Sequence, residues 1–285
     1  MFKTVLDPLW AFDAEWVPDP AAGRLLYGLS QETPDAEVVA EMWKQGGATE
    51  EDPTPYLKTV LCRVVSIAAV QRRTRGKKTE LTLLWLPRDT EDAGQQIEAS
   101  IVGTFLDALG KHRPQLVGFN SYSADLKILI QRAFVQGLAA PEFCKRPEKP
   151  WEGSDYFARN SEAHIDLMDI LGTWGKGSVS LHEAATLSGI PGKIEAEGEL
   201  VAGLWLSGRW RDIVQYNCFD ALTTYLLWLR TAHLAGFFDD AAYLEEQRLV
   251  QELIEEEGTK PGGEYLEHYS DAWHRLREAT GQPLL

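Results

Sequence analysis

Two acids near the start of the sequence stand close enough together to bind a metal ion. Asp13 and Glu15 lie in the stretch "LWAFDAEWVPD", which is otherwise largely apolar. On a β-strand, side chains two residues apart point to the same face, so Phe12, Ala14 and Trp16 would face the other way. Burying two like charges is unfavourable unless a cation is bound, and divalent cations prefer oxygen ligands. The alternative is a strand end whose two acids are solvated.

Two further acids occupy positions that suit either a site or an ordinary fold. Asp125 follows the apolar run "PQLVGFN" and lies at the start of the helical stretch "SADLKILIQRAFVQGL". The helix dipole favours an acid there, but the junction of a strand and a helix is also a usual place for a site in an α/β sheet. Asp220 lies four residues after Tyr216 on a largely apolar helix, so the two share one face. They could be a hydrogen-bonded core pair, or a metal ligand beside a group that positions water.

The elements that must position these acids predict an α/β fold. The runs "VLDPLWAFDAEWV", "TVLCRVVSIAAVQRR", "ELTLLWLP" and "PQLVGFN" predict strands, and the second and third are joined as a hairpin by "RTRGKK". Helical spacing of apolar residues follows in most of the remaining chain, with Ser123 as a candidate helix cap. Strands followed by helices predict a mixed β-sheet flanked by α-helices. The expected helices lie at 93–112, 123–138, 164–174, 180–190, 207–236, and around 240–256 and 263–278.

The chain is expected to consist of one domain with two additions. Residues 1–235 would form the α/β domain, interrupted at about 18–58 by an insertion rich in Pro, Gly and acids with one helical stretch, "DAEVVAEMWKQ". Residues 236–285 would form an acidic helical extension packed on the same domain. Residues 241–285 hold ten acids and four Lys or Arg, a large share of the net charge of −15. This extension could cover the sheet or dock a protein partner.

Taken in order, the acidic motifs resemble the DEDD superfamily of 3′–5′ exonucleases. The set is D-x-E in "FDAEW", N-x4-D in "GFNSYSAD" and Y-x3-D in "YNCFD". Tyr216 resembles the tyrosine-type branch (DEDDy), since the histidine-type branch would need His where this chain has Gln215. The sequences of these three motifs look most like the proofreading exonuclease domain of family B DNA polymerases. The segments "HIDLMDIL" and "GSVSLHEAATLSGIPGK" are similar to the stand-alone predicted relatives of that domain. The resemblance covers about residues 5–235, and one position departs: Ala124 stands where the family commonly has an aromatic residue.

The resemblance implies a ribonuclease H-like fold with two Mg²⁺ or Mn²⁺ ions. Matched residue by residue, the metal ligands would be Asp13, Glu15, Asp125 and Asp220, and Tyr216 would orient the attacking water. The chemistry agrees, because two metals about 3.5–4 Å apart can stabilise the attacking and leaving oxygens of phosphodiester hydrolysis. Oxygen-only ligands suit Mg²⁺ or Mn²⁺ better than zinc. A tyrosine with an ordinary pKa near 10 is a poor base at neutral pH, so hydrogen-bond positioning is its expected role.

Residues near the second motif are candidates for substrate binding. These are Phe119, Asn120 and Tyr122. The rings of Phe119 and Tyr122 could stack on a terminal base, although core packing is the favoured role of Phe119. The basic run "RRTRGKK" at residues 72–78 is more readily explained as a solvated hairpin turn than as a phosphate contact. Asp166, Asp169, His164 and His182 are expected to be structural, with the two acids on one helical face.

Composition and charge narrow the class of protein. No apolar run reaches the roughly 18–20 residues that span a bilayer, and "MFKTVLDPLW" shows no signal-peptide core. Cys62, Cys144 and Cys218 are few and widely spaced, which predicts no zinc site and favours a reduced, cytoplasmic location. The net charge of −15 argues against coating nucleic acid nonspecifically, but not against holding a few nucleotides through metal ions.

We therefore expect a metal-dependent 3′–5′ exonuclease that hydrolyses phosphodiester bonds from single-stranded 3′ ends by a two-metal-ion mechanism, with DNA as the expected polymer and no membrane partner. Two alternatives stay open. One is a catalytically weak or inactive nucleic-acid-binding or scaffold protein on the same fold. The other is an exonuclease that trims RNA, because recognition of the 2′-hydroxyl depends on details of the pocket.

Overall fold

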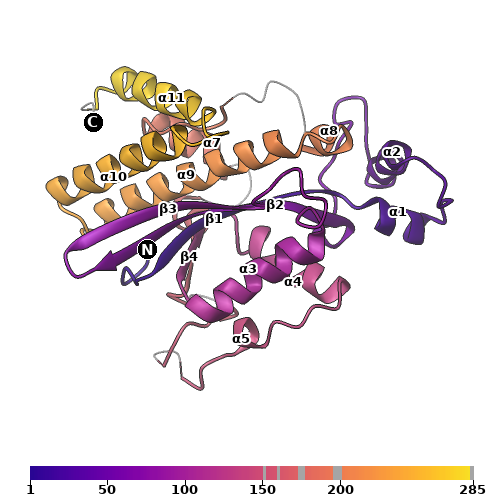
Figure 1. The fold of residues 1–285 in the computed structure, drawn as a ribbon, viewed down its shortest axis with the longest axis horizontal. Coiled ribbons are helices and arrows are strands. Elements are labelled where there is room, and N and C mark those ends of the chain that lie inside the picture. Colours follow the sequence, from indigo (N-terminus) through magenta and orange to yellow (C-terminus); the bar gives the residue numbers. More distant parts are fainter. Residues whose placement is uncertain (150–151, 159–160, 173–176, 195–200, 283–285) are drawn as a thin grey trace.

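The centre of the protein is a five-stranded mixed β-sheet with the strand order β3-β2-β1-β4-β5 (Figure 1). β1 (Leu9–Pro18), β2 (Cys62–Arg75) and β3 (Lys78–Leu86) pair antiparallel in succession. β4 (Gln115–Gly118) and β5 (His164–Asp166) extend the sheet in parallel from β1. The expected α/β class with a mixed sheet is confirmed. The computed structural model describes residues 1–149, 152–158, 161–172, 177–194 and 201–282.

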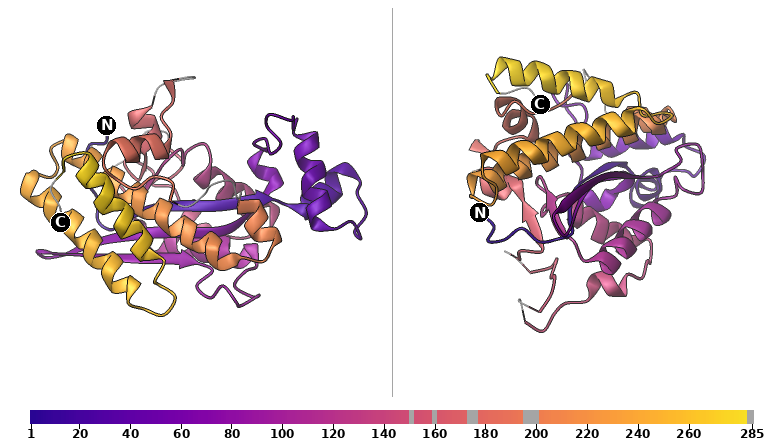
Figure 2. Two further views of the ribbon diagram at one scale, coloured as in Figure 1. Left: turned by 90° about the horizontal axis from the view of Figure 1, so that it is seen from above. Right: turned by 60° about the vertical axis from the view of Figure 1, so that its left-hand side comes forward.

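Helices cover both faces of this sheet. α3 (Glu98–His112), α4 (Asp125–Val135) and the short α5 (Pro141–Cys144) lie on one face, and α9 (Trp210–Leu234) and α10 (Asp240–Gly258) lie on the other (Figure 1). α11 (Leu266–Ala279) packs on α10, in a layer farther from the sheet (Figure 2). The remaining helices are α1 (Pro20–Tyr27), α2 (Asp35–Gln45), η1 (Thr59–Leu61), α6 (Leu167–Leu171), α7 (Leu181–Leu187) and α8 (Val201–Leu206).

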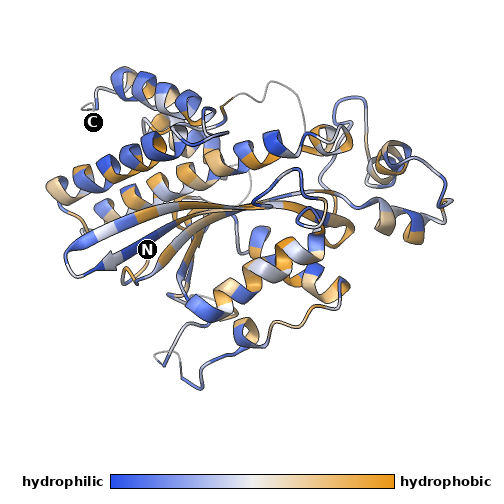
Figure 3. Ribbon diagram, viewed as in Figure 1, coloured by the Kyte–Doolittle hydropathy of each residue, from blue (hydrophilic) through white to orange (hydrophobic). Residues whose placement is uncertain are grey.

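The alternation of side chains along β1 determines which residues meet which helices. Leu9 and Ala11 belong to the apolar core shared with α9, whereas Trp10 and Phe12 belong to the core shared with α3 and α4. Because the period of a strand is two, residues 13 and 15 continue the series that faces α9. Figure 3 shows this apolar layer along the sheet and the hydrophilic colour at the turn between β2 and β3.

The basic run at residues 72–78 divides between a turn and the core. Residues 75–78 are exposed, as a solvated turn predicts, and lie roughly 30 Å along β2 from Ser66, the residue paired with Glu15. Arg72, in contrast, is buried, and its Nε donates to both carboxylate oxygens of Glu246 at 3.1 Å. The Tyr225 hydroxyl donates to the same carboxylate at 2.8 Å. One acid of the C-terminal extension thus joins α10 to β2 and α9, while a protein partner for this extension stays a prediction.

Two local predictions around the second motif were wrong. The helix expected at 164–174 is not one element, because His164–Asp166 form β5 and only Leu167–Leu171 form α6. Its last two residues, 173–174, lie outside the described residues. Asp166 caps α6 by accepting a hydrogen bond from the backbone N–H of Met168 at 3.0 Å, so it shares no helical face with Asp169. A buried strand of three residues is too short to show a period. The cap of α4 is Ala124, which makes no side-chain hydrogen bond, rather than Ser123.

The insertion at 18–58 holds two helices rather than the one expected. α1 was missed although its start carries a strong signal: Asp19 caps the helix and Pro20 occupies its first turn. α1 and α2 pack against each other and lie beyond the end of the sheet, as both Figure 1 and Figure 2 show. The insertion is therefore an appendage at the end of β1.

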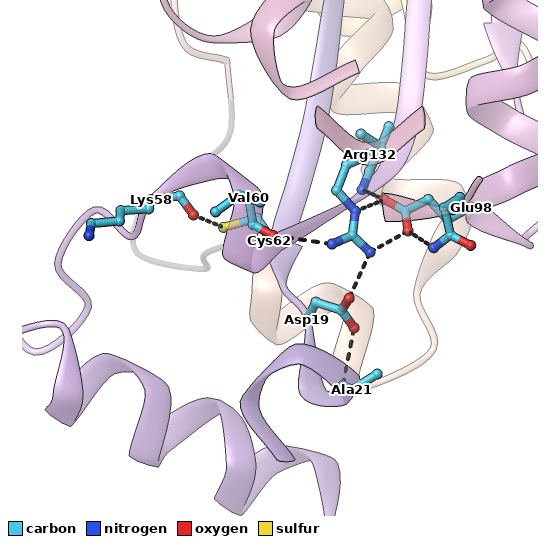
Figure 4. A network of polar contacts seen from close by, with 9 residues as sticks. Asp19, Ala21, Lys58, Val60, Cys62, Glu98 and Arg132 are labelled. Atoms are coloured by element: carbon cyan, nitrogen blue, oxygen red, sulfur yellow. Dashed lines mark hydrogen bonds and ion pairs between the residues drawn. The ribbon is translucent and has the colours of Figure 1, made fainter. Parts of the chain in front are cut away.

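A buried arginine of α4 holds the two ends of this appendage together. The Nη2 of Arg132 donates to Asp19 Oδ2 at 2.7 Å and to Glu98 Oε2 at 2.6 Å, and its Nη1 donates to the carbonyl of Val60 at 3.3 Å (Figure 4). The backbone N–H of Asp19 also donates to the carbonyl of Leu61 at 2.9 Å. Breaking a buried ion pair leaves an uncompensated charge, so these contacts fix the base of the insertion to α3 and α4.

Candidate active site

Three carboxylates converge between β1 and α9. Asp13 and Glu15 point from β1 toward α9, where Asp220 lies in the buried middle of the helix. One carboxylate oxygen of each residue lies within 4.8 Å of the others. Divalent cations bind oxygen at roughly 2.0–2.6 Å, so a single ion between these atoms can contact all three. The arrangement suits a divalent metal.

Asp125 lies at the edge of this group and accepts a hydrogen bond from β1 where that strand has no pairing with β4. The pairing of β1 with β4 ends at Ala11 and Val117. Beyond that point the backbone N–H of Ala14 donates to Asp125 Oδ1 at 3.0 Å, so the first residue of α4 takes the place of a neighbouring strand. Asp125 is only 4% exposed. The hydrogen bond ties the fourth predicted ligand to the strand segment that carries the first two.

Burial makes all four carboxyls hard to ionise, and for Asp13, Glu15 and Asp125 repulsion from neighbouring carboxylates adds to it. Burial raises the pKa of Asp125 to about 7, against an opposing effect of the hydrogen bond from Ala14. Burial also raises the pKa of Asp220 to about 7. The pKa values of Asp13 and Glu15 are raised well above the ordinary range by burial and then by neighbouring carboxylates. A bound cation would relieve this repulsion, which is the electrostatic reason for assigning the cluster to a metal.

Asn217 orients one of the four acids and was missed from the sequence. Its Nδ2 donates to Asp13 Oδ2 at 2.7 Å, and its Oδ1 accepts a hydrogen bond from Ser66 Oγ at 2.9 Å. Both Asn217 and Ser66 are fully buried. The chain from β2 through α9 to β1 fixes the rotamer of Asp13, as partners of metal-binding residues do elsewhere. Asn217 is part of the motif "YNCFD", but no spacing in the sequence predicts its hydrogen bond to Asp13.

Tyr216 lies one helical turn before Asp220 and faces the same group of acids. Burial raises the pKa of Tyr216, and the charges of Asp220, Glu15 and Asp13 raise it further. The hydroxyl therefore stays protonated at physiological pH. Such a hydroxyl can donate a hydrogen bond but is a poor base, and the water-positioning role expected for Tyr216 stays a prediction.

Lys193 supplies a positive charge that the sequence analysis did not assign. It lines the same cavity as the acids, and its charge lowers the pKa of Glu15 and of Asp220 against the stronger effect of burial. It lies in the segment that follows α7, where its backbone N–H donates to His182 Nδ1 at 3.0 Å. A lysine in a loop gives no periodic signal, so its proximity to the acids follows only from the fold.

The four acids open into a cavity of about 660 Å³ whose walls are partly aromatic. Asn120 and Phe119 line it, and Phe119 also packs against the apolar core, as expected. A substrate-binding role for these two residues stays a prediction. Asn120 has a φ of 60°, in the left-handed region that asparagine tolerates, and its N–H donates to Asp166 Oδ1 at 2.8 Å. The other aromatic residues of the wall are Trp16, Tyr56, Tyr216 and Phe219.

Tyr122 does not line this cavity, so stacking on a terminal base finds no support in its geometry. Its hydroxyl donates to the carbonyl of His164 at 2.8 Å, and its ring centroid lies 4.2 Å from that of His164. Its N–H donates to Asp166 Oδ2 at 2.9 Å. Tyr122, His164 and Asp166 therefore hold the loop after β4 to β5, which places Phe119 and Asn120.

A comparison with protein-family models decides the family. The model described as a predicted 3′–5′ exonuclease related to the exonuclease domain of PolB matches residues 54–273, more than half of the chain. The chain belongs to this family. The suspected DEDD relationship and the ribonuclease H-like fold are thereby confirmed. A comparison with curated proteins finds no match.

The extent of the exonuclease match differs at both ends from the expected 5–235. It contains Asp125, Tyr216 and Asp220, but it begins after Asp13 and Glu15. The pairing of β1 with β2 and β4 brings these two acids to the others. At the other end, the match includes α10 and part of α11, which the sequence analysis had set apart as an extension.

The chain was expected to lack a membrane span. Among the residues that the structure describes, no helix is both long and apolar enough to cross a lipid bilayer. A cytoplasmic location stays a prediction.

Proposed function

We propose that this chain is an exonuclease that removes nucleotides from the 3′ end of single-stranded nucleic acid, DNA being the expected polymer, with two Mg²⁺ or Mn²⁺ ions. The observation that carries the proposal is the convergence of Asp13, Glu15 and Asp220, with Asp125 bound to the backbone between the first two. Bound divalent ions would supply the positive charge that stabilises the attacking and leaving oxygens.

The side chains of the site would bind the ions, orient the attacking water and stabilise the phosphate. Asp13, Glu15 and Asp220, with Asp125 beside them, would hold the ions, and Asn217 keeps Asp13 in one rotamer. The protonated hydroxyl of Tyr216 donates a hydrogen bond to the attacking water and directs its lone pair at the phosphorus. Lys193 faces the acids from the opposite loop and offers a charge to the phosphate. These roles are positioning and electrostatic stabilisation, which account for most of the catalysis of phosphate transfer.

The shape of the cavity supports an unpaired strand as substrate. A volume of about 660 Å³ accommodates a few nucleotides at most, and the aromatic walls can stack on exposed bases. The net charge of −15 leaves little attraction for a long polyanion, so binding would depend on metal ions and stacking near the 3′ end.

The proposal is tested with single-stranded DNA and RNA of one sequence, labelled at the 5′ end and incubated with Mg²⁺, Mn²⁺ or EDTA. We expect a ladder that shortens stepwise from the 3′ end with either metal and no products in EDTA. Immediate release of a labelled mononucleotide would indicate the opposite polarity. The absence of cleavage of both polymers with either metal would leave the inactive binding protein as the better account.

A further inference from the structure

Tyr56 is a large aromatic side chain that the insertion presents at the carboxylate cavity. It is 70% exposed, yet it lines the same cavity as Asp13 and Asp125. Within the described part of the chain, its side chain makes no hydrogen bond and no ring contact. One face of a tyrosine ring is therefore open to whatever enters the cavity.

The segment that carries this ring is firmly anchored. The next residue, Leu57, is buried against Gly46, where a Cβ atom would lie only 2.4 Å from the Leu57 Cδ2. Two residues later, the hydroxyl of Thr59 donates to Gln131 Oε1 of α4 at 2.6 Å. Together with the Arg132 contacts of Figure 4, these bonds fix the segment to the helix that begins with Asp125. An exposed ring on a fixed support loses little further entropy when it binds a ligand.

The ring also lies in the field of the acids. Partial burial raises the pKa of Tyr56, and the charge of Asp125 contributes to the same shift. Next to Asp125, the cavity wall is formed by Ala124, which offers only a methyl group. Position 124 offers no aromatic surface to the cavity, whereas Tyr56 of the insertion does.

We propose that Tyr56 stacks on a nucleobase near the 3′ end of the bound strand, so that the insertion helps to select unpaired ends. This inference rests on the proposed function and deepens it. In a duplex both faces of an internal base are covered by its neighbours, so only an unpaired or terminal base offers a face to the ring. Stacking depends on the π-face that every base has, so the selection would be for strandedness and not for sequence.

The test measures binding without cleavage. Fluorescence anisotropy with a 5′-fluorescein single-stranded DNA, with Ca²⁺ in place of Mg²⁺, is compared for the wild type, Tyr56→Ala and Tyr56→Phe. We expect Tyr56→Ala to raise Kd about 5- to 150-fold, the range for a stacked base, and Tyr56→Phe to bind like the wild type. Phe134→Ala is the matched control, because Phe134 is an 86% exposed ring on α4 outside the cavity lining.

A series of oligonucleotides, each abasic at one of the last three positions, locates the base. At the stacked position, the loss caused by Tyr56→Ala should disappear, because the partner base is already gone. Equal Kd values for the wild type and Tyr56→Ala would overturn the inference, as would equal losses in Tyr56→Ala and Tyr56→Phe, which would assign the effect to the hydroxyl. Failure of the proposed function is a separate result, since it appears as a wild type that cuts no polymer.

Discussion

Replacing one buried carboxylate should make the metal-free protein more stable and the metal-bound protein less stable than the wild type. Asp220 is 8% exposed, and burial raises its pKa from 3.8 to about 7. The folded state therefore keeps a proton that the unfolded chain loses between about pH 4 and pH 7. The free energy of unfolding falls as pH rises through this window and then stays low. Relative to low pH, where the carboxyl is protonated in both states, one such group lowers the free energy of unfolding by about 2 kcal/mol at pH 5 and by about 4 kcal/mol at pH 8.

Asp220→Asn removes this cost while it conserves the shape of the side chain. In EDTA at pH 8, we expect the variant to be more stable than the wild type by about 2–4 kcal/mol, with a smaller difference at pH 5. With Mn²⁺ at a thousand times its Kd the order should reverse, because an ion that binds only the folded wild type adds about 4.1 kcal/mol there.

The assay is urea unfolding at pH 5 and pH 8, with EDTA or Mn²⁺, followed by the fluorescence of the ten tryptophans. Asp271→Asn is the matched control, since Asp271 is exposed on α11 and should show neither effect. The reasoning is refuted if Asp220→Asn is less stable than the wild type in EDTA at pH 8, or if Mn²⁺ stabilises both proteins equally.

Three further changes test other parts of the site. Tyr216→Phe should lower kcat roughly 10- to 100-fold, the size of a lost charge-assisted hydrogen bond, with unchanged Mn²⁺ affinity by calorimetry; unchanged turnover would exclude Tyr216 from the mechanism. The apparent Mn²⁺ affinity should rise from pH 6 to pH 8, since protons compete for Asp125 and Asp220, whose pKa values are raised to about 7; a flat calorimetric profile would contradict this. Arg132→Met should lower the free energy of unfolding by about 3–5 kcal/mol, because Glu98 and Asp19 lose their partner, and a loss below 1 kcal/mol would show that the cluster is not structural.

The parts of the fold that the sequence predicted are those with a long or simple period. Asp13 and Glu15 share a face because strands alternate, and α9 is 25 residues long with a nearly continuous buried stretch. Such patterns can be recognised in the sequence without knowing which elements pack against them. The acids of the site could therefore be placed on elements from the sequence and from the resemblance of their motifs.

The parts that could not be predicted depend on partners distant in the chain. Asn217 and Asp13 are 204 residues apart, and Arg72 and Glu246 are 174 apart, so no local pattern joins them. Tyr56 reaches the cavity because its insertion folds back onto α4. The three-residue β5 was misassigned because its hydrogen-bonded partner, β4, determines its structure more than its own residues do.

Counting bound Mn²⁺ by electron paramagnetic resonance tests the central claim most directly. The signal of free Mn²⁺ falls as ions bind. Titrating Mn²⁺ into the protein in the presence of a single-stranded oligonucleotide therefore gives the number of ions bound per chain. The account predicts two ions for the wild type, and fewer for Asp13→Asn and Asp220→Asn, each folded by circular dichroism. Loss of no ion in either variant, or no binding by the wild type at millimolar Mn²⁺, would contradict the assignment of these carboxylates to a metal centre.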